Sequence, residues 1–114
     1  MAEPAIDRAT FEALQETTGA DFVVELADTF LAEAPAMLAE LRRGLETGNA
    51  EAFRRAAHSL KSNCNTLGAL PMGVIARDLE LGGLDKARAS ATPLAELESE
   101  YARVASALKA LRDA

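Results

Sequence analysis

Residues 56–69 of the chain read AAHSLKSNCNTLGA and contain its only histidine, His58. An α-helix turns by about 100° per residue, so the direction of each neighbour around the helix axis follows from its position. The opposite side from His58 is mostly apolar and centred on Leu60, with Asn63 as a bulky polar residue among the apolar ones. The sequence therefore predicts a helix with His58 on its solvent face. Within roughly 60° of His58 lie Glu51, Arg54, Arg55, Lys61, Ser62 and Asn65.

The side chains around His58 point to phosphoryl chemistry. A lone histidine is most often an ordinary surface or core residue, but Arg54, Arg55 and Lys61 surround this one on a chain of net charge −6. A positive patch on an acidic protein suits a strongly negative group such as a phosphoryl. Lys61 can reach a phosphoryl on the ring, and Ser62 is small enough for another protein's backbone to approach. Since neutral imidazole is nucleophilic near pH 7, His58 is the candidate phosphoryl acceptor.

The segment also matches a known pattern. His58-Ser59-Leu60-Lys61-Ser62, followed by Leu67-Gly68-Ala69, resembles the signature of histidine-containing phosphotransfer (HPt) domains of bacterial and fungal phosphorelays. The resemblance extends over nearly the whole chain and includes an upstream run, Phe30 to Pro35. The position after the lysine is often glycine in that family, whereas here it is Ser62, and serine is also common there.

This resemblance implies a phosphoryl carrier and not an enzyme. It implies that His58 accepts a phosphoryl group from a receiver-domain aspartate and passes it to another receiver. Lys61 would then stabilise the phosphoryl, and Ser62 would allow the close approach. It also implies that Glu80, on the following helix, orients the imidazole through Nδ1–H so that Nε2 attacks, although Glu80 could equally be solvated. No cofactor is implied for this chain, because Mg²⁺ and most catalytic groups belong to the receiver.

Composition limits the other function classes. The chain has 114 residues, enough for one domain over residues 1–114, and its 4% aromatic content with abundant alanine and leucine favours helices. A single cysteine, Cys64, favours a reducing compartment, and Met1 to Pro4 has no secretory-signal character, so we expect a cytoplasmic protein. No apolar run approaches the roughly 20 residues that span a bilayer. The acidic balance argues against nucleic-acid binding.

Catalytic motifs are also missing from the sequence. Gly82-Gly83 lacks the spacing and the lysine-serine ending of a phosphate-binding loop. His58 and Cys64 lie on opposite faces of one helix, so they form neither a metal site nor a Cys-His dyad within it.

Hydrophobic periodicity divides the N-terminal half into two helices. The first should run from about Ile6 to Thr17, capped by Asp7 and ended by Gly19, and lie across the end of a bundle. The second should be capped by Asp21 and run to Glu46 or Thr47, where Gly48 ends it. Pro35 should kink this helix near Leu31, and the alternative is a break into two helices. The expected inward stripe is Val23, Ala27, Phe30, Ala34, Met37, Leu41 and Leu45, with Phe22 exposed beside it.

Three further helices are expected. Asn49 should cap a helix from Ala50 to about Thr66. The next should run from about Leu70 to Leu81 and stop at Gly82-Gly83, followed by a polar connection from Leu84 to Ala91 that includes at most one short turn. Thr92-Pro93 should start the last helix, which extends to about Arg112. The inward residues should be Leu70, Val74, Ile75 and Leu79 in the fourth helix, with Met72 as a further candidate, and Leu94, Leu97, Tyr101, Val104, Leu108 and Leu111 in the last.

The predicted fold is therefore all-α, an antiparallel up-down four-helix bundle with an additional short N-terminal helix. Its expected partners are response-regulator receiver domains or a hybrid histidine kinase, and neither a nucleic acid nor a membrane. No exposed apolar stripe demands a dimer, so we expect a monomer. Two alternatives remain, the phosphoacceptor domain of a chemotaxis-type or hybrid kinase and a helical binding module that transfers nothing. The residues expected to contact a partner are Phe22, Arg54, Arg55 and Asn65.

Overall fold

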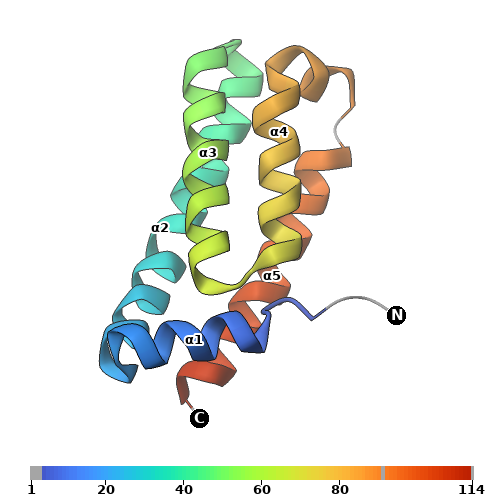
Figure 1. The fold of residues 1–114 in the computed structure, drawn as a ribbon. Coiled ribbons are helices and arrows are strands. Elements are labelled where there is room, and N and C mark those ends of the chain that lie inside the picture. The colour runs from blue at the N-terminus through green and yellow to red at the C-terminus, as the bar shows by residue number, and fades with distance from the viewer. Residues whose placement is uncertain (1–3, 91, 114) are drawn as a thin grey trace.

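The computed structural model describes residues 4–90 and 92–113, and this part of the chain is helical and contains no strand. The elements are α1 (Arg8–Thr18), α2 (Ala20–Thr47), α3 (Ala50–Leu67), α4 (Leu70–Ala89) and α5 (Thr92–Asp113). Helices α2 to α5 run alongside one another in a bundle, and α1 lies across one end of it (Figure 1). The predicted fold class is confirmed. Residues 1–3, which bear on the signal prediction, and Ala91 at the end of the expected connection lie outside the described residues.

The N-terminal ends of α1 and α2 confirm one predicted cap and correct another. The side chain of Asp7 accepts a hydrogen bond from the Thr10 amide at 3.1 Å and caps α1 as predicted, and the helix begins at Arg8, slightly after the expected Ile6. Asp21 does not cap α2. The helix begins at Ala20, directly after Gly19, whose positive φ of 94° turns the chain, and no side chain caps it. Asp21 therefore lies inside the first turn, where its carboxylate faces the positive end of the helix dipole.

Helix α2 continues through Pro35 as one element, as predicted over the broken alternative. Its inward face differs by a small rotation from the expected stripe. Leu38 and Gly44 are buried, whereas Met37 and Leu45 are only half-buried. Gly44 belongs to the face because α3 passes close by: a Cβ added there would be 3.1 Å from the Phe53 Cβ. The buried residues that match the prediction are Val23, Ala27, Phe30, Ala34 and Leu41.

Helix α3 has the two faces that the sequence predicted. Asn49 caps it by accepting a hydrogen bond from the Ala52 amide at 3.0 Å, and Gly68 ends it with a φ of 90°. Leu60 and Cys64 are fully buried, and Asn63 is half-buried at the edge of the core. The remaining buried residues of α3 are Phe53, Ala56, Ala57 and Leu67.

Helix α4 corrects the prediction most. Leu70 and Val74 do not face inward but are exposed, and Ile75 is half-buried. The inner face instead carries Met72 and Leu79 together with small residues, Gly73 and Ala76. Small side chains let the backbone of α4 approach α3 closely, and this packing rotates the larger residues at the start of the helix towards solvent.

The expected polar connection after Gly83 is largely helical. Gly83 interrupts the helix with φ 75° and ψ −176°, and a short helical segment then continues to Ala89. This segment returns to the core because Leu84 and Ala87 are buried. Arg88 fixes it to α2: its Nε and one terminal nitrogen donate to the Leu45 carbonyl at 3.1 and 3.0 Å. Such a side chain satisfies a carbonyl near the end of α2 that has no partner within its own helix.

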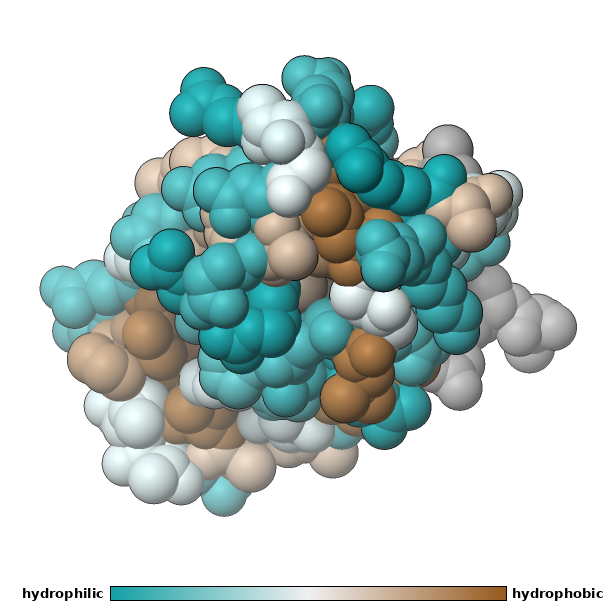
Figure 2. Space-filling view, turned by 90° about the horizontal axis from the view of Figure 1, so that it is seen from above, coloured by the Kyte–Doolittle hydropathy of each residue, from teal (hydrophilic) through white to brown (hydrophobic). Residues whose placement is uncertain are grey.

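Helix α5 closes the bundle with the face that the sequence predicted. Leu94, Leu97, Val104 and Leu108 are buried, and Tyr101 and Leu111 are half-buried. Figure 2 looks onto the end of the bundle away from α1, where hydrophilic residues predominate and hydrophobic ones form separate patches. None of the helices in the described part of the chain has the length and apolar character that a membrane crossing requires.

Candidate functional site

His58 lies midway along α3 with its side chain 54% exposed, as the helical pattern predicted. The residues next to it along the chain explain this orientation. Ala57 and Leu60 are buried in the bundle, so the intervening turn of α3 must present His58 to solvent. Packing of α3 therefore fixes the backbone under the histidine while the imidazole stays accessible.

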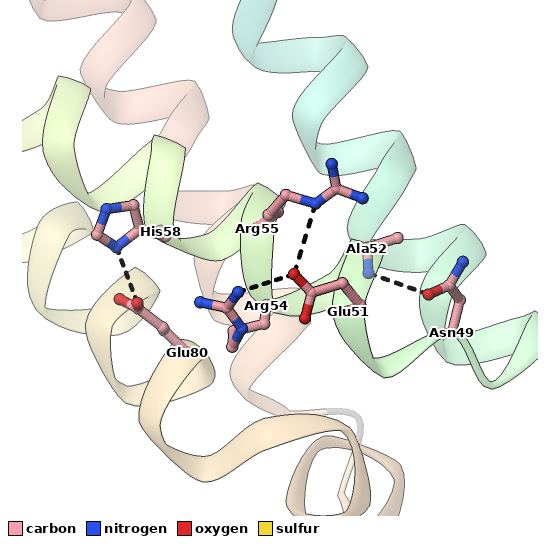
Figure 3. A network of polar contacts seen from close by, with 7 residues as sticks. All are labelled: Asn49, Glu51, Ala52, Arg54, Arg55, His58 and Glu80. Carbon is pink, nitrogen blue, oxygen red and sulfur yellow. Dashed lines mark hydrogen bonds and ion pairs between the residues drawn. The ribbon is translucent and has the colours of Figure 1, made fainter.

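Glu80 of α4 contacts the imidazole directly. Its Oε2 lies 2.8 Å from Nδ1 of His58, and the two side chains face each other across the gap between α3 and α4 (Figure 3). An ionised carboxylate only accepts hydrogen bonds, so Nδ1 is the nitrogen that donates. The other ring nitrogen, Nε2, then carries the lone pair. This contact matches the arrangement expected for Glu80 and differs from the solvated alternative, because its side chain is only 13% exposed.

Lys61 binds the second oxygen of the same carboxylate. Its Nζ lies 2.9 Å from Oε1 of Glu80, so one carboxylate bridges the histidine and the lysine. The hydrogen bond from Lys61 is the largest cause that lowers the pKa of Glu80 below its usual 4.5; burial opposes this shift, and the bond to His58 adds to it. Glu80 is therefore ionised at neutral pH. The ammonium of Lys61 is already paired, and a phosphoryl on His58 would compete with Glu80 for it.

Close packing of α3 and α4 brings Glu80 within reach. Gly73 lies two turns before Glu80, and a Cβ added to it would be only 2.5 Å from Oδ1 of Asn65. Asn65 thus occupies the space that a larger residue at position 73 would fill. It is exposed on its outer side, so a partner can still touch it, but its amide oxygen also forms part of the packing between the two helices.

Arg54 and Arg55, the two arginines of the predicted cationic patch, form ion pairs with Glu51. Glu51 lies 2.8 Å from Arg54 and 3.8 Å from Arg55, one to two turns before His58 (Figure 3). All three side chains are exposed, so these ion pairs are weak and easily exchanged. The patch is therefore less positive than the count of cations suggested. Ser62, one turn after His58, is exposed, as close approach by a partner requires.

Exposed apolar residues lie in two separate places. Phe22 is 47% exposed at the start of α2, as predicted, near the end of the bundle that α1 covers. The sequence reasoning missed the larger group on α4: Val74 is 48% and Leu81 76% exposed, and Leu70 is exposed as well. Residues 70, 74 and 81 follow a helical spacing that could have indicated a surface stripe, but their size and apolar character favour the core when the sequence is considered alone.

Two further predictions concern metal and thiol chemistry. The described residues include no group of three or more His, Cys, Asp or Glu side chains placed to hold a metal ion. Cys64 is fully buried, and burial raises the pKa of its thiol to about 12. It lies on the core side of α3, away from His58, so the two residues do not act together.

Comparison with known proteins agrees with the helical fold. A family model described as the Hpt domain matches residues 25–114. The crystal structure of histidine-containing phosphotransfer protein B (HptB) from Pseudomonas aeruginosa PAO1 superposes with a TM-score of 0.88 at 27% sequence identity. The match covers 98% of this chain and 97% of that one. No curated protein sequence matches the chain.

Proposed function

The chain belongs to the Hpt domain family, whose members carry phosphoryl groups and are not catalytic enzymes, and on this premise we propose that His58 is the phosphoryl-carrying residue. The contact that supports the proposal most is the 2.8 Å bond between Nδ1 of His58 and Glu80. It leaves Nε2 with a lone pair on a half-exposed ring. His58 is also the only histidine in the chain.

The proposed reaction is an exchange between two proteins. The Nε2 lone pair attacks the phosphorus of an aspartyl phosphate on a receiver domain, and a P–N bond forms as the P–O bond to the aspartate breaks. The aspartate leaves as a carboxylate with the bonding electron pair. Nδ1 keeps its proton, so the ring becomes cationic while the phosphoryl oxygens remain anionic. Passing the phosphoryl to a second receiver reverses these steps.

Lys61 and Ser62 support this exchange in different ways. Lys61, which contacts Glu80 in the unphosphorylated protein, can pair with the phosphoryl oxygens once they arrive. Ser62 is small and exposed one turn beyond His58, so it leaves room for the receiver's backbone. The Mg²⁺ that such a transfer uses is proposed to belong to the receiver, and the proposed reaction needs no cofactor bound to this chain.

Receiver docking is proposed for the outer face that α3 and α4 form together. Around the axis of α4, Leu70, Val74 and Leu81 lie roughly 80° to 120° from Glu80, whereas the buried Ala76 lies on its other side. We call these three exposed residues the α4 strip. The core and the α4 strip thus flank Glu80 on opposite sides.

The α4 strip is proposed as part of this face because it lies on the exposed side of α4, the helix that brings Glu80 to His58. The ring is half exposed, and Glu80 is held between the ring and Lys61. Apolar surface beside a cationic site suits a receiver, which presents an anionic aspartyl phosphate surrounded by protein surface. Arg54 and Asn65 lie on the α3 side of this face, Arg55 borders a groove between α3 and α2, and Phe22 lies at the start of α2 near α1.

The remaining finer assignments are part of the same proposal. Response-regulator receivers are the general partner class of the family, and the specific partner here would be a receiver or a hybrid kinase that carries one. We propose a monomer in the cytoplasm, where the buried free thiol of Cys64 would stay reduced.

The deciding experiment is phosphoryl transfer from a panel of phosphorylated receivers to the wild-type protein and His58→Gln. Acid-labile, base-stable label on the wild type alone supports a phosphohistidine at His58. Equal labelling of a folded His58→Gln variant would contradict it. If no receiver labels the folded wild type, a separate kinase domain should be tested as donor, because that result favours the kinase-linked domain or a binding module. Lys61→Ala should accept label more slowly and lose it sooner.

A further inference from the structure

A phosphohistidine that serves as a carrier must also release its phosphoryl group. When Nε2 gives up the phosphoryl, the bonding electron pair stays on the ring. If Nδ1 carries a proton at that moment, the leaving group is neutral imidazole. If Nδ1 has lost its proton, the leaving group is the far more basic imidazolate, and transfer is slow. The protonation of Nδ1 in the phosphorylated protein therefore decides how readily His58 acts as a donor.

Glu80 is fixed in the place that controls this proton. Its Oε2 lies 2.8 Å from Nδ1, and its Oε1 lies 2.9 Å from Nζ of Lys61. A carboxylate held by two partners and only 13% exposed cannot swing away to solvent at little cost. The contact to Nδ1 involves the side of the ring opposite the phosphorylated nitrogen. Glu80 can thus keep its bond to Nδ1 while Nε2 carries the phosphoryl group.

We propose that Glu80 is a positioning residue for onward transfer: its carboxylate keeps Nδ1 protonated after Nε2 is phosphorylated, so that neutral imidazole leaves when the next receiver accepts the phosphoryl. This inference rests on the proposed function of His58. In the step itself, an aspartate oxygen of the receiver forms the new P–O bond and the P–N bond breaks. Its electron pair returns to Nε2, while the proton on Nδ1 does not move.

Lys61 gives the same carboxylate a second role. When Lys61 turns to the phosphoryl oxygens, Glu80 loses its ammonium partner, and the ring then becomes the main cation in direct contact with its carboxylate, with the Arg54 guanidinium as a weaker neighbour. An opposite charge in direct contact stabilises the protonated form of the ring. After phosphorylation, Glu80 therefore stabilises the proton on Nδ1 more strongly, and this is the stage at which His58 acts as the phosphoryl donor.

Other charged side chains around the ring do not replace this contact. On α3, Glu51 is an exposed carboxylate, but it pairs with Arg54 and Arg55 and not with the imidazole. On α4, Arg77 pairs with Asp78, and both are exposed. On α2, Glu33 and Glu40 line a groove on the Arg55 side of α3, away from Glu80. Among the described residues, Glu80 supplies the carboxylate that contacts His58.

The test compares wild type, Glu80→Gln and Glu51→Gln after phosphorylation with phosphoramidate. Gln keeps an oxygen acceptor at position 80 and removes only the charge, whereas Glu51→Gln removes a carboxylate of the same face that does not touch the ring. Phosphorus NMR over a pH series gives the titration midpoint of the phosphorylated imidazole. Glu80→Gln should lower this midpoint by about one pH unit or more, as loss of an opposite charge in contact does. Glu51→Gln should leave it unchanged.

Transfer rates provide the second readout. Onward transfer from phosphorylated Glu80→Gln to a receiver should match wild type near pH 6 and be about tenfold slower near pH 8.5, in line with a one-unit shift. A merely structural role would slow transfer equally at both pH values and leave the midpoint unmoved, and that result would overturn the inference. Failure of wild type to form a phosphohistidine with phosphoramidate or any receiver would instead refute the proposed function itself.

Discussion

The hydroxyl of Tyr101 on α5 donates a hydrogen bond to the backbone carbonyl of Leu31 on α2, across an O···O distance of 3.4 Å. Leu31 is four residues before Pro35, which has no N–H to donate to that carbonyl. The tyrosine therefore supplies the donor that the proline removes, and α2 continues through Pro35 without a break.

This relationship predicts coupling between Tyr101 and Pro35. Tyr101→Phe should lower the free energy of unfolding by about 1 kcal/mol, because it leaves the Leu31 carbonyl without its donor. In a Pro35→Ala background, the new alanine restores the helical N–H, so the same change should cost about half as much or less. Denaturant unfolding of the four proteins measures the difference. An identical cost in both backgrounds would mean that the hydroxyl contributes nothing through Leu31.

Leu60 and Ser59 test the orientation of α3. Leu60 is fully buried and Ser59 is exposed, although they are adjacent in the chain. Leu60→Ala should cost about 2–5 kcal/mol through the cavity that it leaves. Ser59→Ala should stay within about 0.5 kcal/mol of wild type. Thermal or denaturant unfolding distinguishes them, and similar costs for the two variants would show that the faces of α3 are assigned incorrectly.

Cys64 gives an independent measure of the same core. Burial raises the pKa of its thiol to about 12, so at neutral pH the group is both protonated and inaccessible. A thiol reagent should therefore react with the native protein only as fast as the core opens. Leu60→Ala should accelerate labelling about tenfold for every 1.4 kcal/mol of lost stability, whereas rapid labelling of wild type would contradict the buried position.

Local sequence signals predicted most helix limits but missed the start of α2 and the end of α4, and they predicted the inner face of α4 poorly. Asp7, Asn49 and Gly68 are caps or stops that act on their own turn of helix, so the sequence alone reveals them. The inner face of α4 depends on how closely it packs against α3, and Gly73 and Ala76 set that distance. Apolar size favoured Leu70 and Val74 for the core, but tertiary packing excluded them.

In the candidate site, too, the residues that share one helix could be predicted from the sequence, whereas the contacts between helices could not. The helical pattern placed His58, Lys61 and Ser62 on one exposed face because they share one helix. The contact of His58 with Glu80 joins residues 22 positions apart, and periodicity gives no register between two helices. Glu80 was expected from family resemblance only. That Lys61 also binds this carboxylate follows from the packing of α3 against α4, which the sequence does not encode locally.

Gly83 should tolerate substitution poorly because of its backbone conformation. Its φ of 75° with ψ of −176° lies in a region that is essentially restricted to glycine, and it redirects the chain so that Leu84 reaches the core. Gly83→Ala should lower the free energy of unfolding by about 1–3 kcal/mol. The adjacent Gly82→Ala is the matched control, since a Cβ there would meet only the flexible side chain of Lys86. Equal effects would argue against the break at Gly83.

The carboxylate of Glu80 should make stability depend on acid pH. Because its pKa is lowered in the folded state, chiefly by Lys61, it stabilises the protein above about pH 4.5. This contribution is lost as the pH falls through the folded-state pKa. The gap in unfolding free energy between wild type and Glu80→Gln should therefore be present at pH 5 and shrink towards pH 2. A gap that stays constant over this range would show that the charge of Glu80 does not contribute.

Val74 and Phe22 distinguish two positions for the receiver interface. They are nearly equally exposed, 48% and 47%, but Val74 belongs to the α4 strip, on the helix that carries Glu80, whereas Phe22 lies at the start of α2 near α1. Covering the exposed half of a valine side chain contributes about half of the 1.5 kcal/mol of full burial, or a factor of about three to four in affinity. An aspartate at the same place would in addition repel the acidic surroundings of the receiver's aspartyl phosphate.

Val74→Asp should therefore reduce the rate of phosphoryl transfer from a receiver at least about tenfold at subsaturating concentration. Phe22→Asp should change the same rate by less than about twofold, since it lies outside the proposed face. Both side chains are half exposed, so neither change should alter the melting temperature much, and phosphoramidate should label both variants at the wild-type rate. Phosphoramidate serves as the control because it is too small to contact either apolar side chain, whereas a receiver contacts whichever one lies in the interface. If Phe22→Asp slowed transfer more than Val74→Asp, the docking surface would lie at the start of α2.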